Sequence, residues 1–149
     1  MENQGQDLSG KISHLIAVAE DGKHGYENAA KDVKDEYLKS TFLRLSGERD
    51  GYITELQDQL RNLGGPEPTG KGGPVGALHR TWIDIKAALT AGDKDAIIKA
   101  CVTGEEYALK EYQMVIDEIK SGNDLKQLLV KQHAGIQTAL SSITQKLDK

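Results

Sequence analysis

The feature that most constrains the fold of this 149-residue chain is a stretch rich in glycine and proline near its middle. Residues 64–74 hold all three prolines of the chain and a run of glycines, residues that interrupt both helices and strands. Long segments with helical periodicity lie on either side of this stretch. The pattern therefore predicts a helix pair, a crossover and a second helix pair.

Before the loop, apolar residues recur at alternating spacings of four and three, the pattern of a helix with one face in a core. Asp7 is a candidate N-cap for a first helix, and Asp35 for a second one. Because only a turn separates the two helices, we expect them to be antiparallel. Gly64 suits the left-handed position that ends a helix. The first helix pair is expected over about residues 7–63.

After the loop, the periodicity predicts one short helix and two long ones. The short helix, Val75 to Thr90, lies inside a crossover that covers residues 64–92. Asp93 and Asn123 are candidate N-caps for the second helix pair, residues 93–148. A long helix spans roughly 40 Å and the short one roughly 24 Å, so the loop and the short helix together can return along the bundle. The helix that begins at residue 93 should then run parallel to the second helix of the first pair.

Two antiparallel helix pairs joined by one long crossover form the ferritin-like arrangement. We therefore expect an all-α fold, a ferritin-like four-helix bundle with a short fifth helix in its crossover, and residues 1–149 as a single domain. A chain of this length can bury roughly two thirds of its unfolded surface without disulfides.

The charge balance argues against several classes of partner. The chain has 19 basic and 23 acidic residues, a net charge of −4, and no dense basic face for nucleic acid. It has no apolar run near the roughly 18 residues of a membrane span and no leader pattern. The single Cys101 excludes an internal disulfide. We expect a cytoplasmic protein that binds neither nucleic acid nor membrane.

Residues 65–72 match G-x-x-x-x-G-K, the beginning of a phosphate-binding loop. However, Gly72 stands where Ser or Thr should bind magnesium, no strand precedes the loop, and two prolines remove N–H donors. We expect a crossover loop and no nucleotide site.

Four segments of the chain resemble one bacterial family. They are Asp21-Gly22-Lys23-His24-Gly25-Tyr26, Leu63-Gly64-Gly65-Pro66, Gly76-Ala77-Leu78-His79-Arg80-Thr81-Trp82-Ile83-Asp84 and Gly104-Glu105-Glu106. Together they look like a bacterial family of uncharacterised ferritin-like four-helix-bundle proteins, known as a domain of unknown function. The Leu-His-Arg-x-Trp segment is the most specific part. The resemblance implies the fold and no particular activity.

The ferritin-like fold raises the alternative of a di-metal centre that holds iron or manganese. Such a centre needs a Glu from each of two helices and Glu-x-x-His from each of the other two. Here Gly51 stands three residues after Glu48, where His is needed, and Val130 stands three residues before His133, where Glu is needed. A metal site would need an atypical ligand set, with Glu27, Glu48, Glu105, Glu111 and His133 as candidates.

A polar cluster is expected near the middle of the bundle. An inward Arg49 would be very costly unpaired, so Glu105 or Glu111 should accept its hydrogen bonds. Either a structural network that fixes helix register or a remnant ligand or metal pocket fits this pattern. We expect the structural network, because an arginine would repel metal ions. Helix positions assign Tyr26, Arg49, Tyr52, Glu111, Gln132 and His133 to the core, with Glu48 and Glu105 on its flanks.

His79 and Trp82 lie on one face of the short helix. We expect Trp82 to anchor the crossover on the bundle and His79 to bond a carbonyl or carboxylate. The alternative is a phosphoryl-accepting histidine, either His79 or His24, although neither has the sequence surroundings of a phosphotransfer domain.

These observations favour a non-enzymatic bundle, associated with stress by analogy with small bundles of this class. The alternative is a metalloprotein, an oxidase or storage relative that binds iron or manganese. Ile16, Leu43 and Ile53 lie beside the main apolar stripes, and we expect them to support a homodimer through helix faces.

Overall fold

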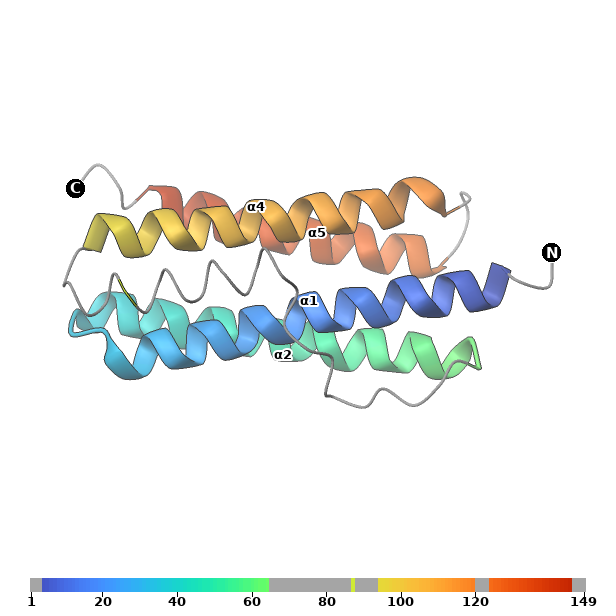
Figure 1. Cartoon of the computed structure of the whole chain (residues 1–149), viewed down its shortest axis with the longest axis horizontal. Helices are drawn as coiled ribbons and strands as arrows, with labels where there is room; N and C mark the ends of the chain where they lie inside the picture. Colours follow the sequence, from blue (N-terminus) through green and yellow to red (C-terminus); the bar gives the residue numbers. More distant parts are fainter. Residues whose placement is uncertain (1–3, 65–86, 88–93, 120–123, 146–149) are drawn as a thin grey trace.

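The computed structural model of the chain describes residues 4–64, 87, 94–119 and 124–145. The predicted short helix over residues 75–90 lies outside this part of the chain except for Ala87, and so do His79 and Trp82. The described residues form four α-helices (Figure 1), namely α1 (Gln4–Asp32), α2 (Glu36–Asn62), α4 (Lys94–Glu118) and α5 (Asp124–Thr144).

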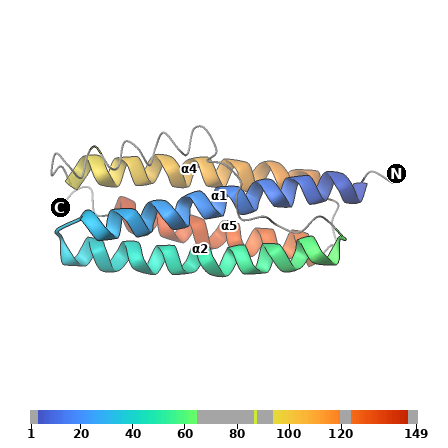
Figure 2. The ribbon, with the colours of Figure 1, turned by 60° about the horizontal axis from the view of Figure 1, so that its bottom comes forward.

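The four helices pack as two antiparallel hairpins, as the sequence predicted. α1 packs along α2 and α4 packs along α5, while α1 also contacts α4 and α2 contacts α5. α2 and α4 are therefore diagonal neighbours, and they run in the same direction (Figures 1 and 2). The predicted parallel orientation of these two helices is confirmed. None of the described helices is long and apolar enough to cross a membrane.

Among the described residues, the core consists of two apolar clusters, one toward each end of the bundle. The first gathers residues from the N-terminal part of α1 and the C-terminal parts of α2 and α4, including Ile12, Leu15, Leu56, Leu60 and Tyr112. The second gathers residues from the opposite ends of those helices, including Tyr26, Phe42, Leu45, Ile98 and Cys101. Two charged residues, Arg49 and Glu105, fall between the clusters in sequence on α2 and α4, and both are buried.

Local chemistry fixes several helix ends. The carboxylate of Asp35 accepts hydrogen bonds from the backbone N–H groups of Tyr37 at 2.9 Å and Leu38 at 3.0 Å, so its predicted N-cap role is confirmed. Gly64 has φ +73°, the left-handed conformation expected after α2. Asp7 is not an N-cap, because α1 already begins at Gln4. The predicted caps Asp93 and Asn123 lie outside the described residues.

Two of the three residues expected at a dimer surface lie in the core instead. Ile16 is 4% exposed and Ile53 is 6% exposed, because both belong to the first apolar cluster. Leu43 is 53% exposed. The expectation was wrong for the two isoleucines because the inward face of each helix is broader than the stripe used to locate it.

Candidate functional site

The polar centre of the bundle is built on Arg49 of α2 and Glu105 of α4, each 2% exposed. Nη2 of Arg49 donates to Oε1 of Glu105 across the diagonal of the bundle. The hydroxyl of Tyr26, from α1, donates to Oε2 of the same carboxylate at 3.0 Å. Both oxygens of Glu105 are therefore bound by side chains of the chain itself, and the carboxylate links three helices.

Gly22 provides the space that Arg49 occupies. A Cβ at Gly22 would lie 3.0 Å from Nε of Arg49 and 3.7 Å from its Cδ and Cγ. A Cβ at this position would require the Arg49 side chain to shift by a few tenths of an ångström. The buried Nη1 of Arg49 has no hydrogen-bond partner among the described residues, so burial of this charge is only partly compensated.

A second polar group lies next to the first along the bundle. The hydroxyl of Tyr112 donates to Oε1 of Gln132 at 2.6 Å. Nε2 of Gln132 donates to Oε1 of Glu55 at 2.9 Å and to the backbone carbonyl of Tyr52 at 3.4 Å. This amide therefore joins α2, α4 and α5. A Cβ at Gly135 would overlap the hydroxyl of Tyr52, so any larger residue at this position of α5 would require the Tyr52 ring to move.

Burial sets the proton affinities of these groups. It raises the pKa of the Tyr26 hydroxyl well above its usual value, and the Glu105 carboxylate raises it further. Burial also raises the pKa of the Cys101 thiol and that of the Tyr112 hydroxyl. The pKa of Glu105 is raised by burial, although Arg49 and Tyr26 oppose the shift. Neither Cys101 nor Tyr26 offers a ready nucleophile near neutral pH.

The structure selects Glu105 as the partner of Arg49 from the two residues that the sequence left open. Glu105 lies in the core and not on its flank, whereas Glu111 lies toward the outside, where its Oε1 is 2.7 Å from Nε2 of His14. His133 was expected in the core and is half-buried. Tyr26 joins the ion pair directly. Gln132 joins the second polar group, and the backbone carbonyl of Tyr52 joins it as well.

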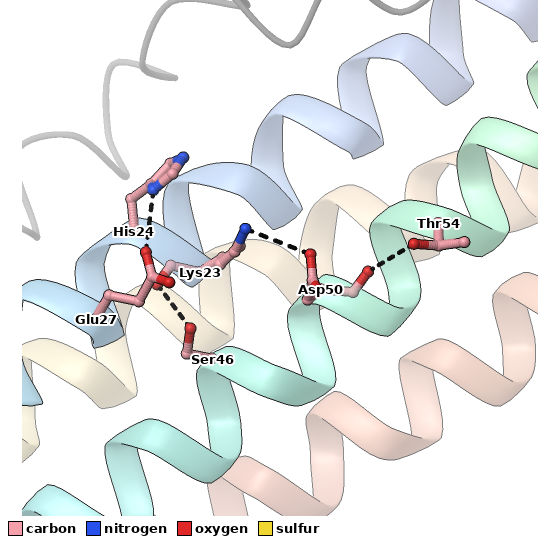
Figure 3. Close-up of polar contacts among 6 residues, drawn as sticks. All are labelled: Lys23, His24, Glu27, Ser46, Asp50 and Thr54. Carbon is pink, nitrogen blue, oxygen red and sulfur yellow. Dashed lines mark hydrogen bonds and ion pairs between the residues drawn. The ribbon is translucent and has the colours of Figure 1, made fainter.

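Four of the five candidate metal ligands, all except His133, are engaged at separate places. Glu48 pairs with Arg44 on the surface, with its Oε2 3.0 Å from Nη1. Oε1 of Glu27 lies 3.3 Å from Nδ1 of His24 on the outer face of α1 (Figure 3). Glu105 and Glu111 have the partners given above. In the part of the chain that the structure describes, no three His, Cys, Asp or Glu side chains are grouped so that they could hold a metal ion.

Further polar contacts lie on the side of the first hairpin that Figure 3 shows, and their side chains range from exposed to buried. Figure 3 shows Lys23 of α1 reaching toward Asp50 of α2, with Nζ 3.3 Å from Oδ1. The Ser46 hydroxyl donates to the backbone carbonyl of Lys23 at 3.2 Å. These contacts join α1 to α2. His24 lies among them with its side chain 64% exposed.

Comparison with known protein families identifies the family of this chain. The family described as "Domain of unknown function (DUF2383)" matches residues 7–118, about three quarters of the chain. The chain belongs to this DUF2383 family. No curated protein sequence matches it. The DUF2383 match covers α2 and α4 completely, and it therefore includes both residues of the buried ion pair.

Sequence reasoning missed three side-chain contacts of this DUF2383 protein. The His14–Glu111 pair depends on how α1 and α4 are shifted along each other, which periodicity does not reveal. The hydrogen bond of Tyr112 to Gln132 could have been suspected, because Tyr112 lies on the apolar side of α4 and a buried tyrosine hydroxyl usually has a partner. The hydrogen bond of Gln132 to Glu55 could not be predicted from the sequence, since Glu55 lies beside the main apolar stripe of α2.

Proposed function

We propose that this protein is a non-enzymatic, cytoplasmic, ferritin-like bundle in which the buried Arg49–Glu105 pair has a structural role. The pair would hold the two hairpins in one register at the position where metal-binding bundles place their ions. The observation that carries this proposal is the double engagement of the Glu105 carboxylate by Arg49 and Tyr26.

Electrostatics supports this interpretation. A di-metal centre carries several positive charges and is normally lined by carboxylates that neutralise them. In this bundle the buried carboxylate already neutralises a guanidinium. A metal ion next to Glu105 would face the positive charge of Arg49 in a medium of low dielectric constant, where the repulsion is strong.

Metal analysis tests the proposal. We expect protein purified without chelators to contain far less than one iron, manganese or zinc ion per chain. Added Mn²⁺ should leave the Tm of wild-type protein unchanged. The matched pair of variants is Glu105→Gln and Glu106→Gln, because Glu105 is buried and the adjacent Glu106 is exposed. Stoichiometric metal that is lost in Glu105→Gln and retained in Glu106→Gln would overturn the proposal.

The alternative function is an iron or manganese protein with an atypical ligand set drawn from Glu27, Glu48, Glu105, Glu111 and His133. The buried carboxylate of Glu105 in a four-helix bundle is the observation that favours it. Metal binding would have to separate Arg49 from Glu105 and to break the pairs of Glu27, Glu48 and Glu111 with their present partners. It would therefore produce a large change in the near-UV CD spectrum upon metal addition.

The association with stress rests on analogy with small bundles of this class, and it is a separate part of the proposal. Transcript levels in the source organism after starvation and after oxidant treatment would test it. Unchanged transcript levels under both treatments would contradict the association with stress. They would not bear on the structural role of the Arg49–Glu105 pair.

A homodimer through a helix face is also proposed, now with Leu43 as its apolar contact. Leu43 is 53% exposed on α2, whereas Ile16 and Ile53 are buried in the core. Sedimentation at micromolar concentration should show a dimer that Leu43→Glu converts to monomer. A wild-type protein that sediments only as a monomer would dispose of this proposal.

A further inference from the structure

A groove of about 340 Å³ lies on the outside of the bundle between α1 and α4, away from the Arg49–Glu105 pair. Its volume falls at the lower end of the range for small-molecule sites, and most of its lining is apolar. The lining residues are Gly10, Lys11 and His14 of α1 and Glu111, Met114, Val115 and Glu118 of α4.

The apolar part of the groove depends on a glycine and a methionine. A Cβ at Gly10 would meet no atom within 4 Å, so the groove is open above this residue. Val115 is 5% exposed and belongs to the core, whereas the neighbouring Met114 is 54% exposed. A flexible, polarizable thioether at the edge of an apolar groove adapts readily to different apolar ligands.

The polar part consists of two pairs that bridge α1 and α4. Nζ of Lys11 lies 3.3 Å from Oε1 of Glu118, and Nε2 of His14 lies 2.7 Å from Oε1 of Glu111. The Glu111 side chain is only 16% exposed, so its carboxylate is held in a fixed place. The two carboxylates carry two formal negative charges against the one formal positive charge of Lys11, with histidine counted as neutral as in the net charge of the chain. The rim then carries one excess negative charge.

We propose that this groove binds a short-chain alkylammonium ion. The alkyl chain would lie over Gly10 and Val115 and against Met114, where it removes apolar surface from water. The ammonium group would donate to the carboxylates of Glu111 and Glu118 and balance the excess negative charge. A carboxylate ligand of the same length would bring a third negative charge to the rim. The proposal is independent of the role assigned to the Arg49–Glu105 pair.

The chain offers a simple reporter for this site. It contains two methionines, Met1 and Met114, so labelling methionine methyl groups with ¹³C gives two NMR signals, of which one lies in the groove. Titration with hexylammonium should shift the Met114 signal in a saturable way. Hexanol should bind more weakly because it lacks the charge, and hexanoate should bind weakest.

A matched pair of glycine variants localises the binding. Gly10 and Gly47 are both exposed helical glycines whose added Cβ would meet nothing within 4 Å, but only Gly10 lines the groove. Gly10→Leu should weaken hexylammonium binding by about tenfold or more, because the new side chain occupies the space of the alkyl chain. Gly47→Leu should leave the affinity unchanged. Far-UV CD verifies that both variants retain the helical content of wild type.

A further variant tests whether hexylammonium binding requires the charge of Glu111. Glu111→Gln keeps the shape of the side chain and removes its charge, so it should weaken hexylammonium binding roughly threefold and leave hexanol binding unchanged. The proposal fails if hexylammonium gives no saturable shift of the Met114 signal. It also fails if hexanol or hexanoate binds as tightly, or if Gly10→Leu binds as well as Gly47→Leu.

Discussion

Arg49 is the residue on which the middle of the bundle most depends. Its charge is compensated by Glu105, while its Nη1 has no acceptor among the described residues. Burial alone would lower the pKa of Arg49, but the adjacent Glu105 carboxylate raises it overall, so the side chain stays charged. Removing one partner of such a pair is more damaging than replacing both, because the remaining charge stays buried and unpaired.

Replacing Arg49 with Met should therefore lower the free energy of unfolding by about 3–5 kcal/mol. The double variant Arg49→Met with Glu105→Gln should recover part of this loss, since it removes the unpaired charge. Chemical denaturation measures both values. The control is Arg44→Met, because Arg44 has a side chain 53% exposed and pairs with Glu48, and its loss should cost no more than about 0.5 kcal/mol. Equal losses for the two single variants would contradict the prediction.

The sequence predicted that Arg49 is buried but could not choose its partner. On α4 the stripe of Cys101, Gly104 and Ala108 consists of small residues, so the direction that faces the core is poorly defined. Glu105, next to Gly104, lies in the core, and Glu111, six residues further along, is only partly buried. The choice depends on how α4 is rotated toward its diagonal neighbour α2, and a single-helix pattern contains no information about that rotation.

At the scale of the elements, helix ends were predicted best where one residue determines the geometry. Asp35 caps α2 and Gly64 ends it, since capping and a positive φ depend on local chemistry. Asp7 was predicted wrongly because α1 begins before it, at Gln4. A helix can begin before a good capping residue when earlier residues also adopt helical geometry.

The Asp35 cap should make the stability of α2 sensitive to acid. Its pKa is lowered chiefly by the backbone N–H of Leu38, and further by that of Tyr37 and by Lys94. Because the folded-state pKa lies below the unfolded value, the stabilisation is present above the unfolded pKa and is lost as the pH falls through the folded value. Asp35→Ala should lower the Tm at neutral pH and have less effect in acid. A Tm difference that stays constant between these conditions would contradict this prediction.

The approach of α5 to α2 should depend on Gly135. Gly135→Ala forces the hydroxyl of Tyr52 to move, whereas Gly51→Ala on the exposed face of α2 meets nothing. Both changes gain helix propensity, so the difference between them isolates the clash. We expect Gly135→Ala to be less stable than Gly51→Ala by about 1–3 kcal/mol, measured by urea denaturation. Adding Tyr52→Phe should restore part of the loss, and no restoration would assign the effect to another contact.

At the scale of the whole molecule, the two-hairpin architecture followed from helix lengths and one loop. The parallel direction of α2 and α4 (Figure 1) was predictable because the sequence between them has enough residues to return along the bundle. The division of the core into two apolar clusters around Arg49 and Glu105 was not predictable in the same way. It depends on the register of four helices, which side-chain packing sets.

Buried tyrosines should make the whole fold sensitive to alkali. Tyr26 is fully buried and Tyr112 is 1% exposed, and burial raises the pKa of both hydroxyls above the usual value. A group whose folded-state pKa is raised contributes stability that is present below its unfolded pKa and is lost as the pH rises above it. Above about pH 10, each of these tyrosines should therefore lower the free energy of unfolding by about 1.4 kcal/mol per pH unit.

This alkaline prediction is checked by following tyrosinate absorbance and helical CD in one titration. The absorbance of the buried tyrosines should appear in a single step together with the loss of helix, because these hydroxyls ionise when the chain unfolds. Tyr112→Phe should reduce the pH dependence of the unfolding free energy by the contribution of one tyrosine and leave that of Tyr26. Complete tyrosinate absorbance in a chain that retains its helical CD would contradict this prediction. It would mean that Tyr26 and Tyr112 ionise within the folded bundle, although both residues are buried there.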